Sequence, residues 1–180
     1  MNPIAIIQKY YNPDSEAYKI LVNHSRSVAD KALQIAEMHP EMPLDKPFIE
    51  EAAMLHDVGV FYCDAPEIGC FGTEPYIRHG FLGAELMRKE GFPRHALVCE
   101  RHTGTGIYRE DVEARHLPLP DWDFFPVTLE EQIICFADKF FSKTKLGKEK
   151  EISKIQASLR KYGEDSVLRF NNWCKLFLRQ

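Results

Sequence analysis

Six side chains of metal-ligating type fall on the apolar faces of predicted helices. They are His24, His56, Asp57, His79, His102 and Asp138. The adjacent pair follows the apolar run at residues 52–55 and precedes Val58 and Gly59, so an imidazole and a carboxylate are expected where a core helix stops. Burying both costs several kcal/mol unless each has a strong partner, and a divalent cation would satisfy both.

Helical periodicity places the other four in the same interior, because positions three or four apart share a face. His24 lines up with Leu21, and His79, His102 and Asp138 take equivalent places on three later helices. A single inward histidine is more often a hydrogen-bonded core residue, and a His-Asp pair at a helix end can be a cap. Six such groups directed at one interior favour a metal site.

The donor types restrict the ion without naming it. Imidazole and carboxylate ligands suit Fe, Mn, Zn or Co, and Mg is also compatible. Adjacent side chains such as His56 and Asp57 diverge by only ~100° and can converge on one ion. The five cysteines form no CxxC pair and are odd in number, so neither a disulfide framework nor a thiolate zinc site is favoured.

The order His24, His56-Asp57 and Asp138 resembles the HD-domain superfamily of metal-dependent phosphohydrolases, which is named after the His-Asp pair. His-Asp-Val-Gly is similar to the His-Asp-Ile-Gly (HDIG) variant of one branch, and the resemblance covers roughly residues 17–146. The further histidines His79 and His102 resemble the branch that holds a second metal. That branch includes bacterial hydrolases of symmetrical dinucleoside tetraphosphates and the cyclic-dinucleotide phosphodiesterases.

The resemblance implies an all-α HD-domain helical bundle with two ions. It assigns the first ion to His24, His56, Asp57 and Asp138, and the second to Asp57, His79 and His102, with Asp57 bridging. Such ions lie ~3.5–4 Å apart, activate a water and stabilise the leaving oxygen of an in-line displacement. The catalytic set would then be Asp57, His79 and His102.

Phosphate oxygens also need positive partners. Arg78 and Arg101 each precede a candidate ligand and Lys139 follows one, so all three start near the centre. We include Arg101 and Lys139 in the catalytic set, although a neighbour on a helix points ~100° away and could be plain surface charge. Val60 stands where many relatives have a lysine, so any phosphate contact made by that lysine must come from elsewhere.

The implied reaction is hydrolysis of a phosphate ester or anhydride of a nucleotide or related small molecule. A cyclic-dinucleotide phosphodiesterase is less favoured, because no Gly-Tyr-Pro signature is present. The alternatives are a non-catalytic nucleotide-binding sensor and a di-iron oxygenase of the same superfamily.

Composition sets wider bounds. A chain of 180 residues with 44% apolar and 28% charged content is expected to be one soluble domain over residues 1–180. The net charge of −4 argues against general nucleic-acid binding. No run approaches the ~18 apolar residues of a membrane span, so a cytoplasmic protein is expected. A monomer and a homodimer both remain open.

Start and stop signals predict the elements that position these side chains. After a leader, helices are expected at residues 12–38, 45–59, 76–90, 93–102 and 128–147, with two amphipathic helices in 149–178 packed on the bundle. Residues 60–75 and 107–127 are predicted to be irregular, either framing the substrate or merely connecting helices. The Thr-Gly run at 103–106 is predicted to be a turn rather than a phosphate cradle. Trp122 and its neighbouring phenylalanines are expected to pin their segment to the core rather than stack on a base.

Overall fold

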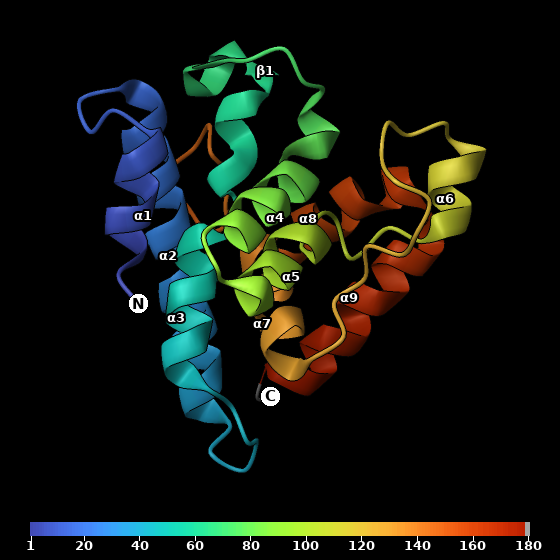
Figure 1. The fold of residues 1–180 in the computed structure, drawn as a ribbon. Coiled ribbons are helices and arrows are strands. Elements are labelled where there is room, and N and C mark those ends of the chain that lie inside the picture. The colour runs from blue at the N-terminus through green and yellow to red at the C-terminus, as the bar shows by residue number, and fades with distance from the viewer. Residues whose placement is uncertain (179–180) are drawn as a thin grey trace.

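The computed structural model describes residues 1–178 and is mainly helical (Figure 1). The α-helices are α1 (Pro3–Tyr10), α2 (Glu16–Met38), α3 (Lys46–Leu55), α4 (His79–Lys89), α5 (Pro93–Arg101), α6 (Arg109–Ala114), α7 (Leu129–Asp138), α8 (Ile152–Leu159) and α9 (Glu164–Phe177). Within the described range the regular strands are β1 (Asp64–Ala65) and β2 (Cys70–Phe71), an antiparallel pair. The predicted all-α class is therefore confirmed. Arg179 and Gln180, the last two residues of the predicted domain, lie outside the described residues.

The helices enclose two adjoining apolar cores. One is built by α2, α3, α7, α8 and α9, and the other by α1, the start of α2, the β-hairpin, α4 and α5. In Figure 1, α1 to α3 form one side, α9 forms the other, and α4 and α5 lie between them at the front. His24 lies between Leu21 of one core and Val28 of the other. The candidate ligands are therefore placed where the two cores meet.

Local signals explain where the main helices begin. The side-chain oxygens of Ser15, Asp45 and Thr128 each accept a hydrogen bond from the backbone N–H three residues later. Such caps satisfy amides that have no partner inside the helix. The starts of α3 and α7 thus agree with the predicted boundaries, whereas α2 begins at Glu16 rather than at residue 12 as predicted. None of the helices in residues 1–178 is both long and apolar enough to cross a membrane.

The leader and the two segments predicted to be irregular contain short elements. The leader forms α1, residues 60–75 contain the β-hairpin, and residues 107–127 contain α6. The helix that carries His56 also ends at Leu55 rather than Gly59, and a 3-10 helix follows at Val58–Tyr62. These elements are too short to show a periodic pattern, and tertiary contacts stabilise them.

The helix that carries Asp138 is shorter than predicted, because α7 ends at Asp138 rather than at Gly147. Its last turn tightens: the Phe141 N–H bonds to the Asp138 carbonyl three residues back. The chain then folds over, and the Lys150 ammonium donates to the Phe141 carbonyl at 2.8 Å. The segment after α7, which carries Lys143, is therefore not helical, although the sequence predicted one helix through residue 147.

Gly59 lies where the 3-10 helix crosses α4. A Cβ added there would lie 2.3 Å from the His79 carbonyl oxygen and 2.4 Å from the Gly83 nitrogen, both backbone atoms. Gly59→Ala is expected to lower the free energy of unfolding by about 3 kcal/mol or more, because α4 must shift. Urea denaturation measures this. Gly83→Ala is the comparison, since its nearest contact is 3.2 Å and it should cost less. Equal losses would contradict the explanation.

Candidate metal centre

Five segments far apart in the sequence deliver the six candidate ligands to one place. His24 lies within α2, His56 and Asp57 follow α3, His79 begins α4, His102 follows α5, and Asp138 ends α7. The first five are buried, and only the Asp138 side chain is partly open, at 13% exposure. The structure thus brings together all six residues that the sequence indicated.

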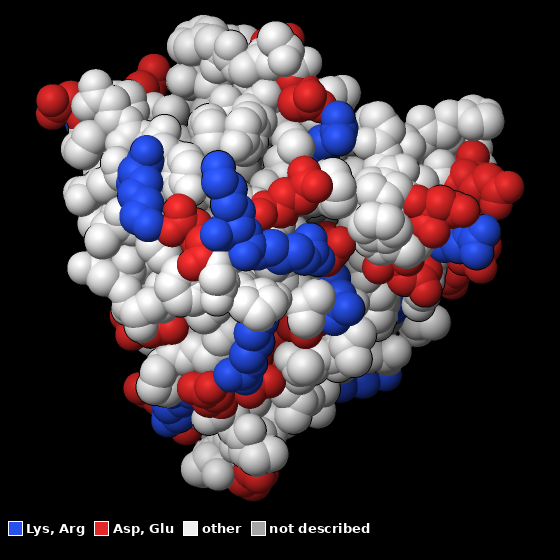
Figure 2. Space-filling view, viewed as in Figure 1, with Lys and Arg blue, Asp and Glu red and all other residues white. Residues whose placement is uncertain are grey.

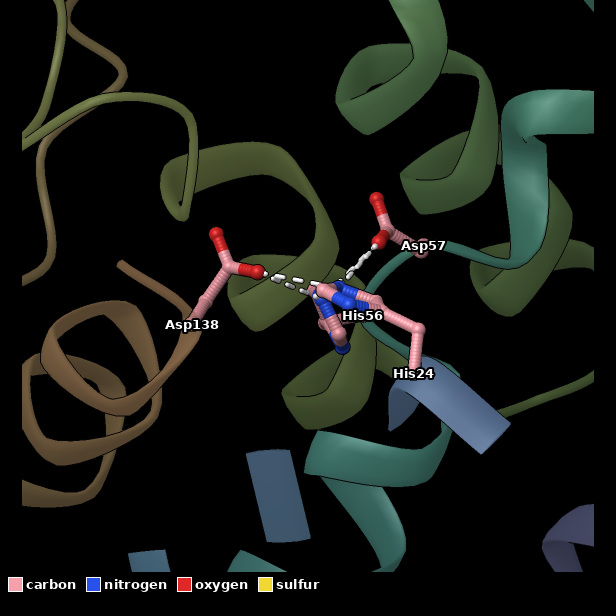
Figure 3. Close-up of side chains that lie close together, drawn as sticks. All are labelled: His24, His56, Asp57 and Asp138. Atoms are coloured by element: carbon pink, nitrogen blue, oxygen red, sulfur yellow. Dashed lines mark hydrogen bonds and ion pairs between the residues drawn. The ribbon is translucent and has the colours of Figure 1, made fainter. Parts of the chain in front are cut away.

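The first cluster contains His24, His56, Asp57 and Asp138, whose ligand atoms lie within 4.8 Å of one another (Figure 3). The His24 Nε2 atom is 3.0 Å from Asp138 Oδ1 and 3.2 Å from Asp57 Oδ2. The His56 Nε2 atom is 3.0 Å from Asp57 Oδ2 and 3.5 Å from Asp138 Oδ1. Two imidazole nitrogens and two carboxylate oxygens suit one divalent ion.

The second cluster contains Asp57, His79 and His102. Both imidazole Nε2 atoms lie 3.3 Å from Asp57 Oδ1 and 3.0 Å from each other. The two oxygens of Asp57 therefore face different clusters: Oδ2 faces the first and Oδ1 the second. One carboxylate placed in this way could bridge two ions.

Backbone contacts orient three of the imidazoles. His56, His79 and His102 each donate Nδ1–H to the carbonyl oxygen three residues earlier, at 2.6, 2.6 and 2.8 Å. A neutral imidazole that donates from Nδ1 carries its lone pair on Nε2, which is the atom facing Asp57. When these imidazoles are neutral, the backbone thus selects the tautomer that binds a metal.

The charges at the centre are strongly coupled. Burial raises the pKa of Asp57, but the positive charges of His56 and Lys143 outweigh it and hold that pKa well below its usual range. Burial lowers the pKa of His79 to about 3 and also lowers the pKa of His102, despite the nearby Asp57. Burial alone would lower the pKa of His56, but the carboxylates of Asp57 and Asp138 outweigh it and raise that pKa to about 9. The second cluster therefore offers neutral imidazoles, the form that binds metal.

Unpaired polar atoms test whether a metal fits. Among residues 1–178, His56 Nε2 and both carboxylate oxygens of Asp57 are buried without a hydrogen bond of good geometry. Such atoms are costly in a folded protein unless something satisfies them. The donors, their distances and their missing partners fit divalent metal ions. The number and identity of the ions stay predictions.

Two lysines from the segment after α7 reach the carboxylates. Lys139 Nζ lies 2.8 Å from Asp138 Oδ2 and also donates to the His102 carbonyl at 3.1 Å. Lys143 Nζ lies 2.6 Å from Asp57 Oδ2. Lys139 was among the predicted site residues and Lys143 was not, because a helix continued through residue 147 gives no indication that Lys143 folds back.

A pocket of about 630 Å³ opens onto the first cluster, with His24 and Asp138 in its wall. Its other walls come from residues 67–68, 76–77 and 103–107, from α6 and α8, from the segment after α7, and from residues 162–166. The basic side chains lining it are Arg115, Lys139, Lys143, Lys150 and Lys154. Apart from Asp138, its acidic side chains are Glu67 and Asp111. The pocket is therefore suited to an anionic ligand.

The structure does not bring Arg101 to the ligands. Its guanidinium lies 3.0 Å from the Glu131 carboxylate and does not line the pocket. Arg78 likewise pairs with Glu74, at 2.5 Å. Figure 2 shows the face over α4 and α5, where basic and acidic side chains intermingle. The placement of Arg101 gives its predicted phosphate contact no support.

The three remaining histidines, His39, His95 and His116, lie outside both clusters. His39 is buried and its Nε2 lies 3.2 Å from the Phe177 carbonyl, whereas His116 is exposed. His39→Ala is expected to lower the free energy of unfolding by about 1–2 kcal/mol, because it removes a buried hydrogen bond. Metal content should not change. Urea denaturation and elemental analysis measure the two effects, and His116→Ala should alter neither. Loss of metal in His39→Ala would show that the metal centre has been assigned to the wrong residues.

Comparison with known proteins gives three kinds of match. The HD domain family model matches residues 21–142. An uncharacterized protein of Methanocaldococcus jannaschii is 35% identical over 128 residues, which cover 69% of this chain and 68% of that protein. The HD domain of the L. monocytogenes phosphodiesterase PgpH superposes with a TM-score of 0.56 at 16% identity, covering 92% of this chain and 84% of that one. At this identity the superposition shows a shared fold.

Two further relatives are named tRNA (cytidine(56)-2'-O)-methyltransferase. The protein of Thermoplasma volcanium is 32% identical over 83% of this chain, and that of Picrophilus torridus is 31% identical over 71%. This chain spans only 39% and 33% of their respective lengths. The similarity therefore concerns one part of each larger protein.

Proposed function

The chain belongs to the HD domain family of metal-dependent phosphohydrolases, and we propose that it hydrolyses a phosphate ester or anhydride of a nucleotide or related small molecule. We assign the metal ligands as His24, His56, Asp57 and Asp138 for one ion, and Asp57, His79 and His102 for the other. The observation that carries the proposal is the position of Asp57, with one carboxylate oxygen facing each cluster.

The chain's own residues would divide the work at this centre. The six ligands would hold divalent metal, which would supply Lewis-acid chemistry for activating water and stabilising a leaving oxygen. The backbone carbonyls that accept from Nδ1–H keep the imidazoles oriented. Burial of His79 and His102 excludes bulk water from the second cluster. Lys139, held by Asp138 and the His102 carbonyl, presents a fixed positive charge to phosphoryl oxygens in the pocket.

The pocket supports a nucleotide-sized substrate. Its volume of about 630 Å³ lies within the range of about 300–1,000 Å³ typical of small-molecule sites. Its five basic side chains favour phosphate groups, whereas Tyr76, Tyr162 and Leu159 offer apolar surface to a base or sugar. A nucleotide combines these two kinds of surface in one molecule.

Phosphate release across a substrate panel tests the proposal. Nucleoside mono-, di- and triphosphates, dinucleoside polyphosphates and cyclic dinucleotides would each be supplied with Mn, Fe, Co, Zn or Mg. We expect turnover of one class that stops on chelation and returns when metal is restored. If no substrate in the panel releases phosphate while metal is bound, the proposed hydrolase function is wrong. A nucleotide bound without turnover would then favour a sensor, and an iron-dependent spectrum would favour an oxygenase.

A further inference from the structure

We propose that Lys143 exchanges partners, pairing with Asp57 in the metal-free protein and with a phosphoryl group of the substrate once metal ions hold Asp57. The second half rests on the proposed function, whereas the first concerns the protein without substrate. Lys143 would thus both oppose metal binding and assist substrate binding. These two roles have effects of opposite sign when the charge is removed.

The contact competes directly with a metal ion. Lys143 Nζ lies 2.6 Å from Asp57 Oδ2, the oxygen that also faces His24 and His56. The Asp57 side chain is fully buried and that of Lys143 is 13% exposed. A divalent ion on this oxygen would lie about 2 Å from it, so ion and ammonium would stand within about 5 Å of each other. Two cations so close in a buried site repel strongly.

The two lysines at the centre are held differently. Lys139 bonds to a backbone carbonyl as well as to Asp138, so its position does not depend on the carboxylate alone. Among residues 1–178, the Lys143 ammonium has Asp57 as its ion-pair partner and lies 5.7 Å from the Tyr76 ring. Lys143 also follows the end of α7 and has no helical backbone around it. Lys143 is therefore the lysine that can move away from its carboxylate.

The pocket can accommodate the Lys143 ammonium after it leaves Asp57. Lys143 lines the same pocket as Asp138 and Lys139, into which a substrate phosphate must enter to reach the first cluster. Val60, which follows the His-Asp-Val-Gly stretch, is apolar and buried and contributes no charge. A short movement of a long side chain would take Lys143 from Asp57 to a phosphate oxygen.

Metal affinity measured without substrate tests the first half. Lys143→Met keeps the length of the side chain and removes its charge, and is expected to bind Mn²⁺ about tenfold more tightly, because a competing cation is gone. Competition against a fluorescent chelator measures this. Lys145→Met is the control, since Lys145 is exposed nearby in the same segment, and should bind like the wild type. Lys143→Arg should also stay close to wild type. Equal or weaker Mn²⁺ binding by Lys143→Met overturns the proposal.

Inorganic phosphate serves as the probe for the second half. Calorimetry on the Mn²⁺-loaded protein should show phosphate binding about tenfold weaker in Lys143→Met than in the wild type, with Lys143→Arg restoring most of it. In the enzyme assay KM should rise by more than kcat falls. Unchanged phosphate affinity overturns this half. Circular dichroism checks the fold, and Lys143→Gln replaces the methionine variant if that one misfolds.

These readouts separate the inference from the function. Tighter Mn²⁺ binding and weaker phosphate binding in a protein that hydrolyses nothing would overturn the proposed function and support the exchange by Lys143. An active enzyme whose Mn²⁺ affinity is unchanged in Lys143→Met and Lys143→Gln would support the function and overturn the exchange.

Discussion

Asp57→Ala is expected to abolish hydrolysis, by at least about 10³-fold, and to remove bound metal at the same time. Asp57 offers one oxygen to each cluster, so its loss takes a ligand from both. It also leaves the Lys143 ammonium without its ion-pair partner, which should cost about 3 kcal/mol of stability. Phosphate release, elemental analysis and urea denaturation measure the three effects.

Two further variants separate loss of the ligand from loss of the fold. Asp57→Asn keeps the shape of the side chain and removes its charge, so it should lose metal while staying folded. Asp64→Ala removes an exposed carboxylate that lies outside both clusters and should keep metal and activity. Wild-type turnover in a folded Asp57 variant would contradict the assignment of the centre.

Separate replacement of His79 and His102 by alanine is expected to lower the bound metal from two ions to one. Both residues belong to the second cluster, and neither contributes to the first except through Asp57. Loss of a residue that merely supports a metal ligand costs about 10–100-fold in metal affinity or activity, and loss of a ligand should cost no less, so activity should fall by about 100-fold. Native mass spectrometry or elemental analysis counts the ions.

Two other metal counts would contradict this prediction, and each has a different meaning. An unchanged count in both variants would mean that the protein holds a single ion at the first cluster. Loss of all metal would mean that the clusters do not bind independently. His116→Ala provides the baseline, because its side chain is exposed and belongs to neither cluster.

The amino-acid sequence determined which residues form the candidate centre and which helices carry most of them. His24 could be placed on an inward face because its neighbours repeat at helical spacing, a purely local property. The starts of α3 and α7 followed from caps at Asp45 and Thr128, which act within one turn. Periodicity and capping are short-range effects, so they can be predicted from residues that are close together in the sequence.

The tertiary structure determined which atoms of these residues face each cluster and which charged side chains contact them. That Asp57 turns one oxygen to each cluster depends on the packing of α4 against the 3-10 helix at Val58–Tyr62 and of α5 against α3. The early end of α7 brings Lys143 back onto Asp57, and no periodic signal marks that fold. Arg101 adjoins His102 in the sequence, yet pairs with Glu131 from another helix. Each outcome depends on a partner distant in the chain, and such partners are set only when the helices pack.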